Sequence, residues 1–464
     1  MNDMEKEQEK DNPLGIEKIS VLLRKFAVPS IVAMLVSSLY NIVDQVFIGQ
    51  GVGYLGNAAT NVAFPLTTIC MAIALLFGIG GAANFSLSLG RGDREDAART
   101  VSNVLYMVIL FGVLYAVFIE CFLTPLLNAF GATDNVFPFA VKYARITAIG
   151  IPFLIFTNAI SALIRADGSP KYSMMCMVTG AVLNTILDPL FIFGFEMGIE
   201  GAAWATTISQ IVSFLCAFCY LRRFQSVKLK KEHFQLQIGR CVQIASLGLS
   251  NSLTQLSITL IQIVMNHSLT YYGMRSVYGE DIPLSAAGIV MKVNSILIAV
   301  FVGLSQGSQP ILGYNYGAAQ YGRVKAVYQL AVKCSFVVST VGFILFQFFP
   351  KYIIALFGSA DNELYIEFAV KFMRIFLFMI IINGVQLISS NFFSAIGMPF
   401  KGILLSLSRQ VIFLIPLMLI LPVFWGIDGV MFAAPVADTI AFVFSIVLVK
   451  REFGKMTLKQ SELT

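Results

Sequence analysis

The chain alternates between long apolar runs and short polar connections over nearly its whole length. A transmembrane helix needs about 20 mostly apolar residues to cross the hydrocarbon core of a bilayer. Measured against that length, the apolar runs predict twelve membrane-spanning helices. They are residues 26–48, 58–88, 101–123, 143–164, 172–194, 198–221, 242–270, 284–312, 326–349, 371–396, 402–422 and 426–449. The fold class that follows is an all-α membrane protein.

Composition supports this interpretation. Of the 464 residues, 57% are hydrophobic and 12% are charged, whereas a soluble domain carries about 25% charged residues. So few charges cannot cover a water-facing surface, which excludes a soluble enzyme or a disordered scaffold. The net charge of +6 comes from bases clustered between apolar runs. Because these bases do not line one polar face, nucleic acid is not an expected partner; the lipid bilayer is.

The distribution of lysine and arginine predicts the orientation, since cytoplasmic loops retain these residues. One set of loops carries most of the bases, above all the long segment 222–240. On the other side, the loops 50–57, 194–201 and 422–429 contain none. We therefore expect a multi-pass protein of the cell (inner or plasma) membrane with both termini in the cytoplasm. The polar start of the chain, 1–25, does not resemble a cleavable signal peptide.

The second half of the chain repeats the first. FAVKYARI at 139–146 returns as FAVKFMRI at 368–375, and FGATDN at 130–135 returns as FGSADN at 357–362. We therefore expect two related six-helix bundles in the same orientation around a central cavity, an architecture of secondary transporters. Because one chain holds both halves, we also expect a monomer. The predicted parts are a cytoplasmic segment 1–25, an N-lobe 26–221, a linker 222–241, a C-lobe 242–449 and a cytoplasmic tail 450–464.

Two acidic residues lie inside predicted spans, where a charge costs a few kcal/mol. Asp44 is in the first span and Asp188 in the fifth, and the helical rise places them at similar depth. Asn184 lies one turn before Asp188, on the same helix face.

The repeat offers an internal control for these residues. The second-half positions that correspond to Asp44, Asn158, Asn184 and Asp188 are Met265, Leu387, Phe413 and Leu417. If helix packing required the acids, the second copy would be expected to keep some of them. The comparison favours a functional role in the first half, with structural carboxylates that neighbouring helices satisfy as the alternative.

The chemistry of these groups suggests ion coupling. An apolar environment favours the protonated form of a carboxyl group, so a buried acid can exchange protons near physiological pH. The same oxygens at Asp44, Asn184 and Asp188 could instead hold Na⁺. One charge that crosses 100 mV releases about 2.3 kcal/mol, which can drive another solute outward. H⁺ and Na⁺ both remain open as the coupling ion, and we expect no other metal and no cofactor.

Other intramembrane residues extend the hypothesis. Pro29 lacks an N–H, which permits the first helix to bend there, and it is the hinge candidate. Asp438 in the last span is either a second cation or substrate site or a structural ion-pair partner. Arg409, Lys292 and Lys333 lie near span ends, where long basic side chains extend to the interface.

Three segments carry a family resemblance. NTILDPLFIFG at 184–194, GAAWATTISQ at 201–210 and GLSQGSQPILGYNYGA at 303–318, with Pro29 and Asp44, resemble the multidrug and toxic compound extrusion (MATE) transporters. The acids in the first half resemble the DinF-like branch. The resemblance implies alternating-access antiport of protons or sodium against amphipathic, often cationic drugs, with bending at the first-span proline. Its coupling site maps onto Asp44, Asn158, Asn184, Asp188 and Thr206.

Rival functions fit the sequence less well. An exporter of one endogenous metabolite or of a lipid-linked precursor is the main alternative, although a pyrophosphate cargo calls for bases inside the membrane. A membrane enzyme needs a nucleophile–base pair or a metal cluster, and the two isolated histidines offer neither. We therefore expect no enzyme. A passive channel suits the paired halves less well than alternating access does.

Overall fold

The computed structural model describes residues 12–279, 281–355 and 363–463, and the regular structure in these ranges is helical. Within these ranges, eleven helices are long and apolar enough to cross a membrane, and one bent helix pair makes a twelfth span. The spans other than the bent pair are α3 (Ile19–Gly51), α4 (Tyr54–Gly90), α5 (Arg94–Ala129), α6 (Phe137–Ala166), α7 (Pro170–Pro189) with η1 (Leu190–Gly194), α8 (Gly198–Tyr220) with η2 (Leu221–Arg223), α9 (Ile238–Gly273), α10 (Asp281–Gly317), α11 (Tyr321–Phe348), α15 (Pro399–Leu407) with η4 (Ser408–Leu414) and α16 (Ile415–Trp425), and α17 (Ile427–Leu463). The all-α membrane fold and the number of spans predicted from the sequence are confirmed.

The tenth span was expected as one helix over 371–396, but the structure shows a broken helix. It consists of α13 (Glu363–Phe376) and α14 (Ile380–Ala395), which meet at an angle of 50°. The break falls on Leu377–Met379, where the backbone closes short turns such as Phe378 N–H to Ile375 O. These residues are as apolar as the helices they join, so a count of apolar residues does not detect the break. Three shorter helices are α2 (Pro13–Ile16), α12 (Pro350–Ala355) and η3 (Lys231–His233).

The repeat is visible in local structure. The turn before α7 contains Gly168 with φ +89°, and the turn before α15 contains Gly397 with φ +81°. A proline follows two residues later in both places and begins the helix. Glycine adopts positive φ without strain and proline suits the first turn of a helix, so the two halves use the same device. The FGSADN copy at 357–362 and residues 1–11 of the N-terminal segment lie outside the described residues.

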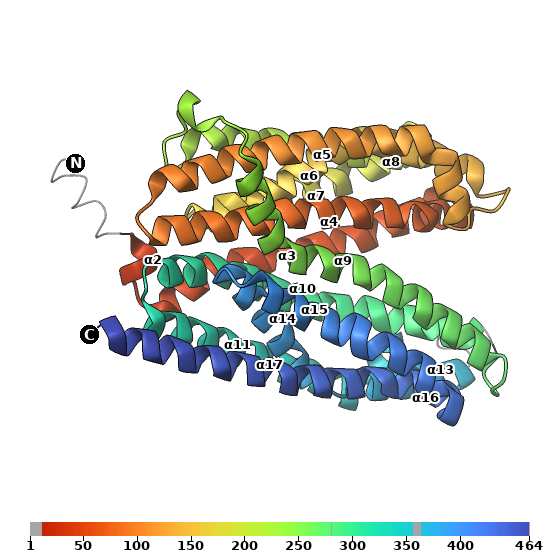
Figure 1. The fold of residues 1–464 in the computed structure, drawn as a ribbon. Helices are drawn as coiled ribbons and strands as arrows, with labels where there is room; N and C mark the ends of the chain where they lie inside the picture. The colour runs from red at the N-terminus through yellow and green to blue at the C-terminus, as the bar shows by residue number, and fades with distance from the viewer. Residues whose placement is uncertain (1–11, 280, 356–362, 464) are drawn as a thin grey trace.

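The first six spans and the last six form two groups of helices that lie side by side (Figure 1). Helix α2 and the C-terminal end of α17 lie at one end of the molecule, which we call the terminal end (left in Figure 1). The two groups meet mainly where α3 and α4 contact α9 and α10. From this contact α9 runs away from α4 toward the opposite end (Figure 1).

Glycines allow backbones of the two halves to touch near the terminal end. A Cβ atom at Gly80 of α4 would lie 1.9 Å from Ile244 O of α9. A Cβ at Gly307 of α10 would lie 2.5 Å from Ala27 Cα of α3, so no larger residue fits either position without movement. Helices in membranes pack closely through such small residues. The halves are therefore in tight contact at this end.

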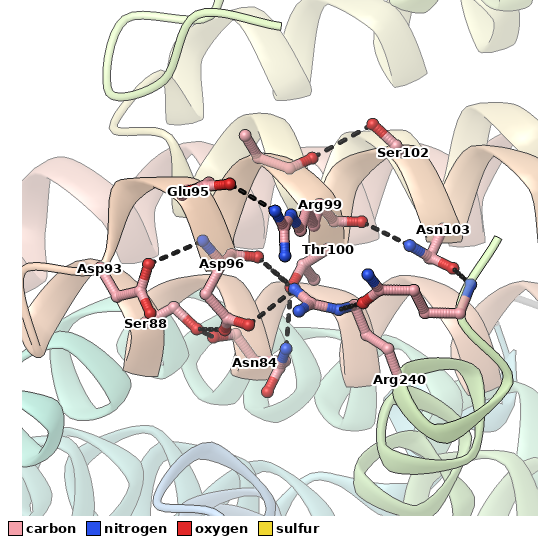
Figure 2. A network of polar contacts seen from close by, with 12 residues as sticks. Asn84, Ser88, Asp93, Glu95, Asp96, Arg99, Thr100, Ser102, Asn103 and Arg240 are labelled. Carbon is pink, nitrogen blue, oxygen red and sulfur yellow. Dashed lines mark hydrogen bonds and ion pairs between the residues drawn. The ribbon is translucent and has the colours of Figure 1, made fainter. Parts of the chain in front are cut away.

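The segment between the halves is fixed to α5 by polar contacts (Figure 2). The buried Asn103 donates to Gln235 O at 3.2 Å and accepts from Gln237 N at 2.8 Å. Arg240 at the start of α9 pairs with Asp96 at 2.7 Å. The first turn of α9 is thus held against the first half of the molecule.

Candidate functional site

Three helices of the first half bring polar side chains together away from the terminal end. Asp44 comes from α3, Asn184 and Asp188 from α7, and Thr206 from α8. Asn184 Nδ2 donates to Asp188 Oδ1 at 3.2 Å and to Thr206 Oγ1 at 3.3 Å. The carboxyl groups of Asp44 and Asp188 contact each other at hydrogen-bonding distance. The structure thus assembles four of the five residues of the predicted coupling site, and we call them the carboxyl cluster.

Local sequence explains how α7 presents its two members. Asn184 and Asp188 are four residues apart and so lie on one helix face. Pro189 follows directly, and its missing N–H removes one bond from the regular helical ladder. The backbone then continues as a π-helix over Leu190–Gly194. Such widened turns occur frequently at functional sites.

The cluster contains acceptor oxygens without donors. Asp188 and Asn184 are buried. Within the described residues, Asp44 Oδ1, Asp188 Oδ2 and Asn184 Oδ1 accept no hydrogen bond from a protein donor. Two carboxyl groups in contact repel each other when both are negative. They therefore either share one proton or bind a cation between them. The arrangement can therefore hold a shared proton, or a hard cation such as Na⁺ that prefers oxygen ligands.

Two tyrosines that were not predicted from the sequence lie at the carboxyl cluster. Tyr40 on α3 is buried near Asp44 and Asp188. Tyr143 on α6 lies near both acids and hydrogen bonds with Thr206. Comparison of the two halves of the sequence could have found these tyrosines. The second-half residues that correspond to Tyr40, Tyr143 and Thr206 are Ile261, Phe372 and Ala434, so the hydroxyl groups are lost there together with the acids.

Asn158 is not part of this cluster. Its amide donates to Leu154 O of its own helix at 2.9 Å. Tyr143 and Asn158 are 15 residues apart on α6, which is about 22 Å along a helix. Since Tyr143 reaches Thr206, Asn158 lies far toward the terminal end. The structure thus places Asn158 apart from the carboxyl cluster, and its part in coupling stays a prediction.

Pro29 lies within α3 at its contact with the second half. Ala27 and Ile31, which flank it, meet Gly307 and Gly303 of α10. The helix continues through the proline from Ile19 to Gly51. A bend at Pro29 would therefore disturb a close helix–helix contact.

Asp438 is engaged in a buried ion pair in the second half. Arg409 Nε donates to Asp438 Oδ1 at 2.6 Å, and Asn383 Nδ2 donates to Asp438 Oδ2 at 3.4 Å. The Arg409 side chain is 15% exposed, so the prediction that it extends to the membrane interface is wrong. The Asp438 carboxylate on α17 holds the Arg409 side chain inside the protein. The sequence around Arg409 does not indicate this partner. Of the two alternatives for Asp438, the structure supports the ion pair.

Comparison with known families matches the chain in two ranges, one in each half. A family model described as MatE matches residues 29–190 and 251–420, which is most of the chain. The chain belongs to the MatE family. The matched ranges include Asp44, Asn184 and Asp188 and end before Asp438.

Relatives in the MatE family match over almost the full length. The "Multidrug export protein MepA" of Staphylococcus saprophyticus is 24% identical over 454 residues, which cover 96% of this chain and 97% of that protein. A crystal structure of MATE in complex with MaL6 superposes with a TM-score of 0.90 at 22% identity, covering 96% and 98% of the two chains. An outward-facing MATE multidrug resistance transporter gives 0.89 at 22%, with the same coverage. The chain therefore has the fold of these transporters, and it is a multi-pass membrane transporter and not an enzyme.

Proposed function

We propose that the protein is a secondary active antiporter that exports amphipathic, often cationic multidrug compounds in exchange for H⁺ or Na⁺. The observation that carries this proposal is the contact between the Asp44 and Asp188 carboxyl groups, with Asn184 and Thr206 beside them. The export activity in the name of the staphylococcal relative supports the direction of transport. The position of the acids in the first half supports a DinF-like assignment.

The contact between the halves supports alternating access. In this proposal the terminal end faces the cytoplasm and is closed by the glycine contacts of α3 and α4 with α9 and α10. Arrival of a proton or a cation changes the charge of the carboxyl cluster, and α3 transmits the change to Pro29. Bending there separates Ile31 from Gly303, which loosens the closed end. A single chain contains both halves, so the proposed unit of transport is a monomer.

The alternative of a lipid-linked cargo has less support. A pyrophosphate group inside the membrane needs a free cation, and Arg409 is neutralised by Asp438. An exporter of one endogenous metabolite uses the same fold and the same coupling. Transport assays with several unrelated substrates separate the two.

The test is efflux of a fluorescent cationic dye from proteoliposomes under an imposed H⁺ gradient and, separately, an imposed Na⁺ gradient. Wild type is compared with Asp188→Asn and with the control Glu120→Gln, whose exposed acid pairs with Arg145 at 3.5 Å. We expect dye movement under one gradient, its loss in Asp188→Asn and its retention in the control. Equal efflux by Asp188→Asn contradicts coupling through the carboxyl cluster. No dye movement under either gradient contradicts multidrug antiport.

A further inference from the structure

A cavity of about 510 Å³ lies at the terminal end, where the two halves and the segment between them meet. Its walls come from α2 and the start of α3, the end of α4 with the turn into the start of α5, the turn between α6 and α7, the linker and Tyr314 of α10. This volume is in the range of ordinary small-molecule sites. The carboxyl cluster contributes no residue to it.

The charged side chains of this cavity are mostly basic. Lys25, Arg91 and Arg94 line it. Within the described ranges, neither arginine forms an ion pair, and Lys25 has only Glu17 at 3.9 Å on the surface. We call these three residues the basic cradle.

The one lining carboxylate among the described residues is already occupied. Asp167 accepts hydrogen bonds from Tyr220 Oη at 2.8 Å, Gln225 N at 2.8 Å and Ser226 N at 2.9 Å. These bonds hold the linker in place as one wall of the cavity. Because Asp167 points its charge at donors of the protein, the basic cradle remains free to attract an anion.

A second hollow, of about 470 Å³, lies beside the first and shares Lys25 and Gly168 with it. Its other walls are the first turns of α7, including Lys171, Tyr172 and Met175. Met175 is 45% exposed on the outside of the helix bundle. Tyr172 and Met175 thus place apolar side-chain surface next to the basic cavity.

We propose that these joined hollows bind one anionic phospholipid, with its phosphate in the basic cradle and an acyl chain along Tyr172 and Met175. Basic pockets between membrane helices bind anionic headgroups, and each base near the surface contributes to that attraction. The walls come from both halves, so a bound lipid strengthens the contact that closes the terminal end. The proposal concerns a site separate from the carboxyl cluster and stands or falls independently of the transport function.

The test is calorimetric titration of the full-length protein, in an uncharged detergent, with short-chain phosphatidylglycerol. Short-chain phosphatidylcholine and glycerol 3-phosphate are titrated in parallel. We expect phosphatidylglycerol to bind best, because phosphatidylcholine lacks the net charge and glycerol 3-phosphate lacks the tail. Arg91→Gln/Arg94→Gln is expected to bind phosphatidylglycerol about 30-fold more weakly, the effect of two lost surface bases.

A matched control is Arg222→Gln/Arg451→Gln, which removes two exposed arginines outside both hollows. This control is expected to bind like wild type. Met175→Gln is expected to weaken phosphatidylglycerol binding and leave glycerol 3-phosphate unchanged. Equal binding by the cradle variant and wild type overturns the site. Binding of glycerol 3-phosphate as tight as that of phosphatidylglycerol overturns the lipid as its occupant and indicates a soluble phosphate compound.

Discussion

The two halves of the molecule place opposite chemistry at corresponding positions. In the first half, Tyr40, Asp44, Tyr143, Asp188 and Thr206 form a polar cluster. The corresponding second-half residues belong to or pack against one hydrophobic core: Ile261, Met265, Phe372, Leu417 and Ala434. The same helix arrangement is therefore stable with an apolar interior at this place. The helix arrangement by itself therefore does not call for polar groups at this place, which supports the proposed role of the first-half cluster in ion binding.

The largest expected effect comes from converting the first half into a copy of the second. The variant Asp44→Met/Asp188→Leu carries the second-half residues at both acids. We expect it to fold with stability equal to wild type or about 1–4 kcal/mol higher, because apolar residues replace buried ionisable ones. Dye efflux driven by an ion gradient should be abolished. Thermal unfolding and proteoliposome transport together check this. Gradient-driven efflux by the variant would contradict a role of the two acids in coupling.

The second-half ion pair should respond in the opposite way. Arg409→Gln leaves the buried Asp438 without its cation, so we expect a loss of about 3–5 kcal/mol in the free energy of unfolding. Arg409→Met/Asp438→Leu removes both charges and should recover most of that loss, as measured by thermal unfolding in detergent. A double variant that is stable but unable to transport would show that Asp438 takes part in transport.

A smaller effect is expected at the close contact between the halves. In Gly80→Ala the new Cβ would meet Ile244 O at 1.9 Å, which forces α4 and α9 apart at a cost of about 1–3 kcal/mol. Labelling of Cys241, on the first turn of α9, by a water-soluble maleimide should then become faster. The control is Gly288→Ala in α10, where a Cβ meets no atom within 4 Å. Similar labelling rates in both variants would mean that this contact does not close the terminal end.

The smallest effect is expected from removal of one hydroxyl group, that of Tyr143. Tyr143→Phe introduces the residue that the second half has at Phe372 and removes the hydrogen bond with Thr206. A net value of about 0.5–1.5 kcal/mol for such a bond predicts roughly 2- to 10-fold weaker binding of the coupling ion. The concentration of H⁺ or Na⁺ that half-saturates efflux measures this. Tyr54→Phe, at a position 81% exposed, should behave like wild type, and an identical result for Tyr143→Phe would place Tyr143 outside the site.

The sequence by itself determined the spans, the two halves and the core of the site. Bilayer thickness imposes a length of about 20 apolar residues on each span, so hydropathy alone locates the helices. The spacing of Asn184 and Asp188 is a property of one helix, which is why it needs no tertiary information. Comparison of the two copies then singled out the acids of the first half, because the second half has apolar residues at the same positions.

Only the tertiary structure decided which side chains of different helices meet. Tyr143 reaches Thr206 while Asn158 on the same helix does not, because depth and rotation of α6 are set by its packing against α8. Arg409 turns inward because Asp438 faces it from α17. The bend at Leu377–Met379 is equally invisible in an apolar run. Hydrophobicity fixes how far a segment extends through the membrane, whereas contacts between helices depend on the fit of their surfaces.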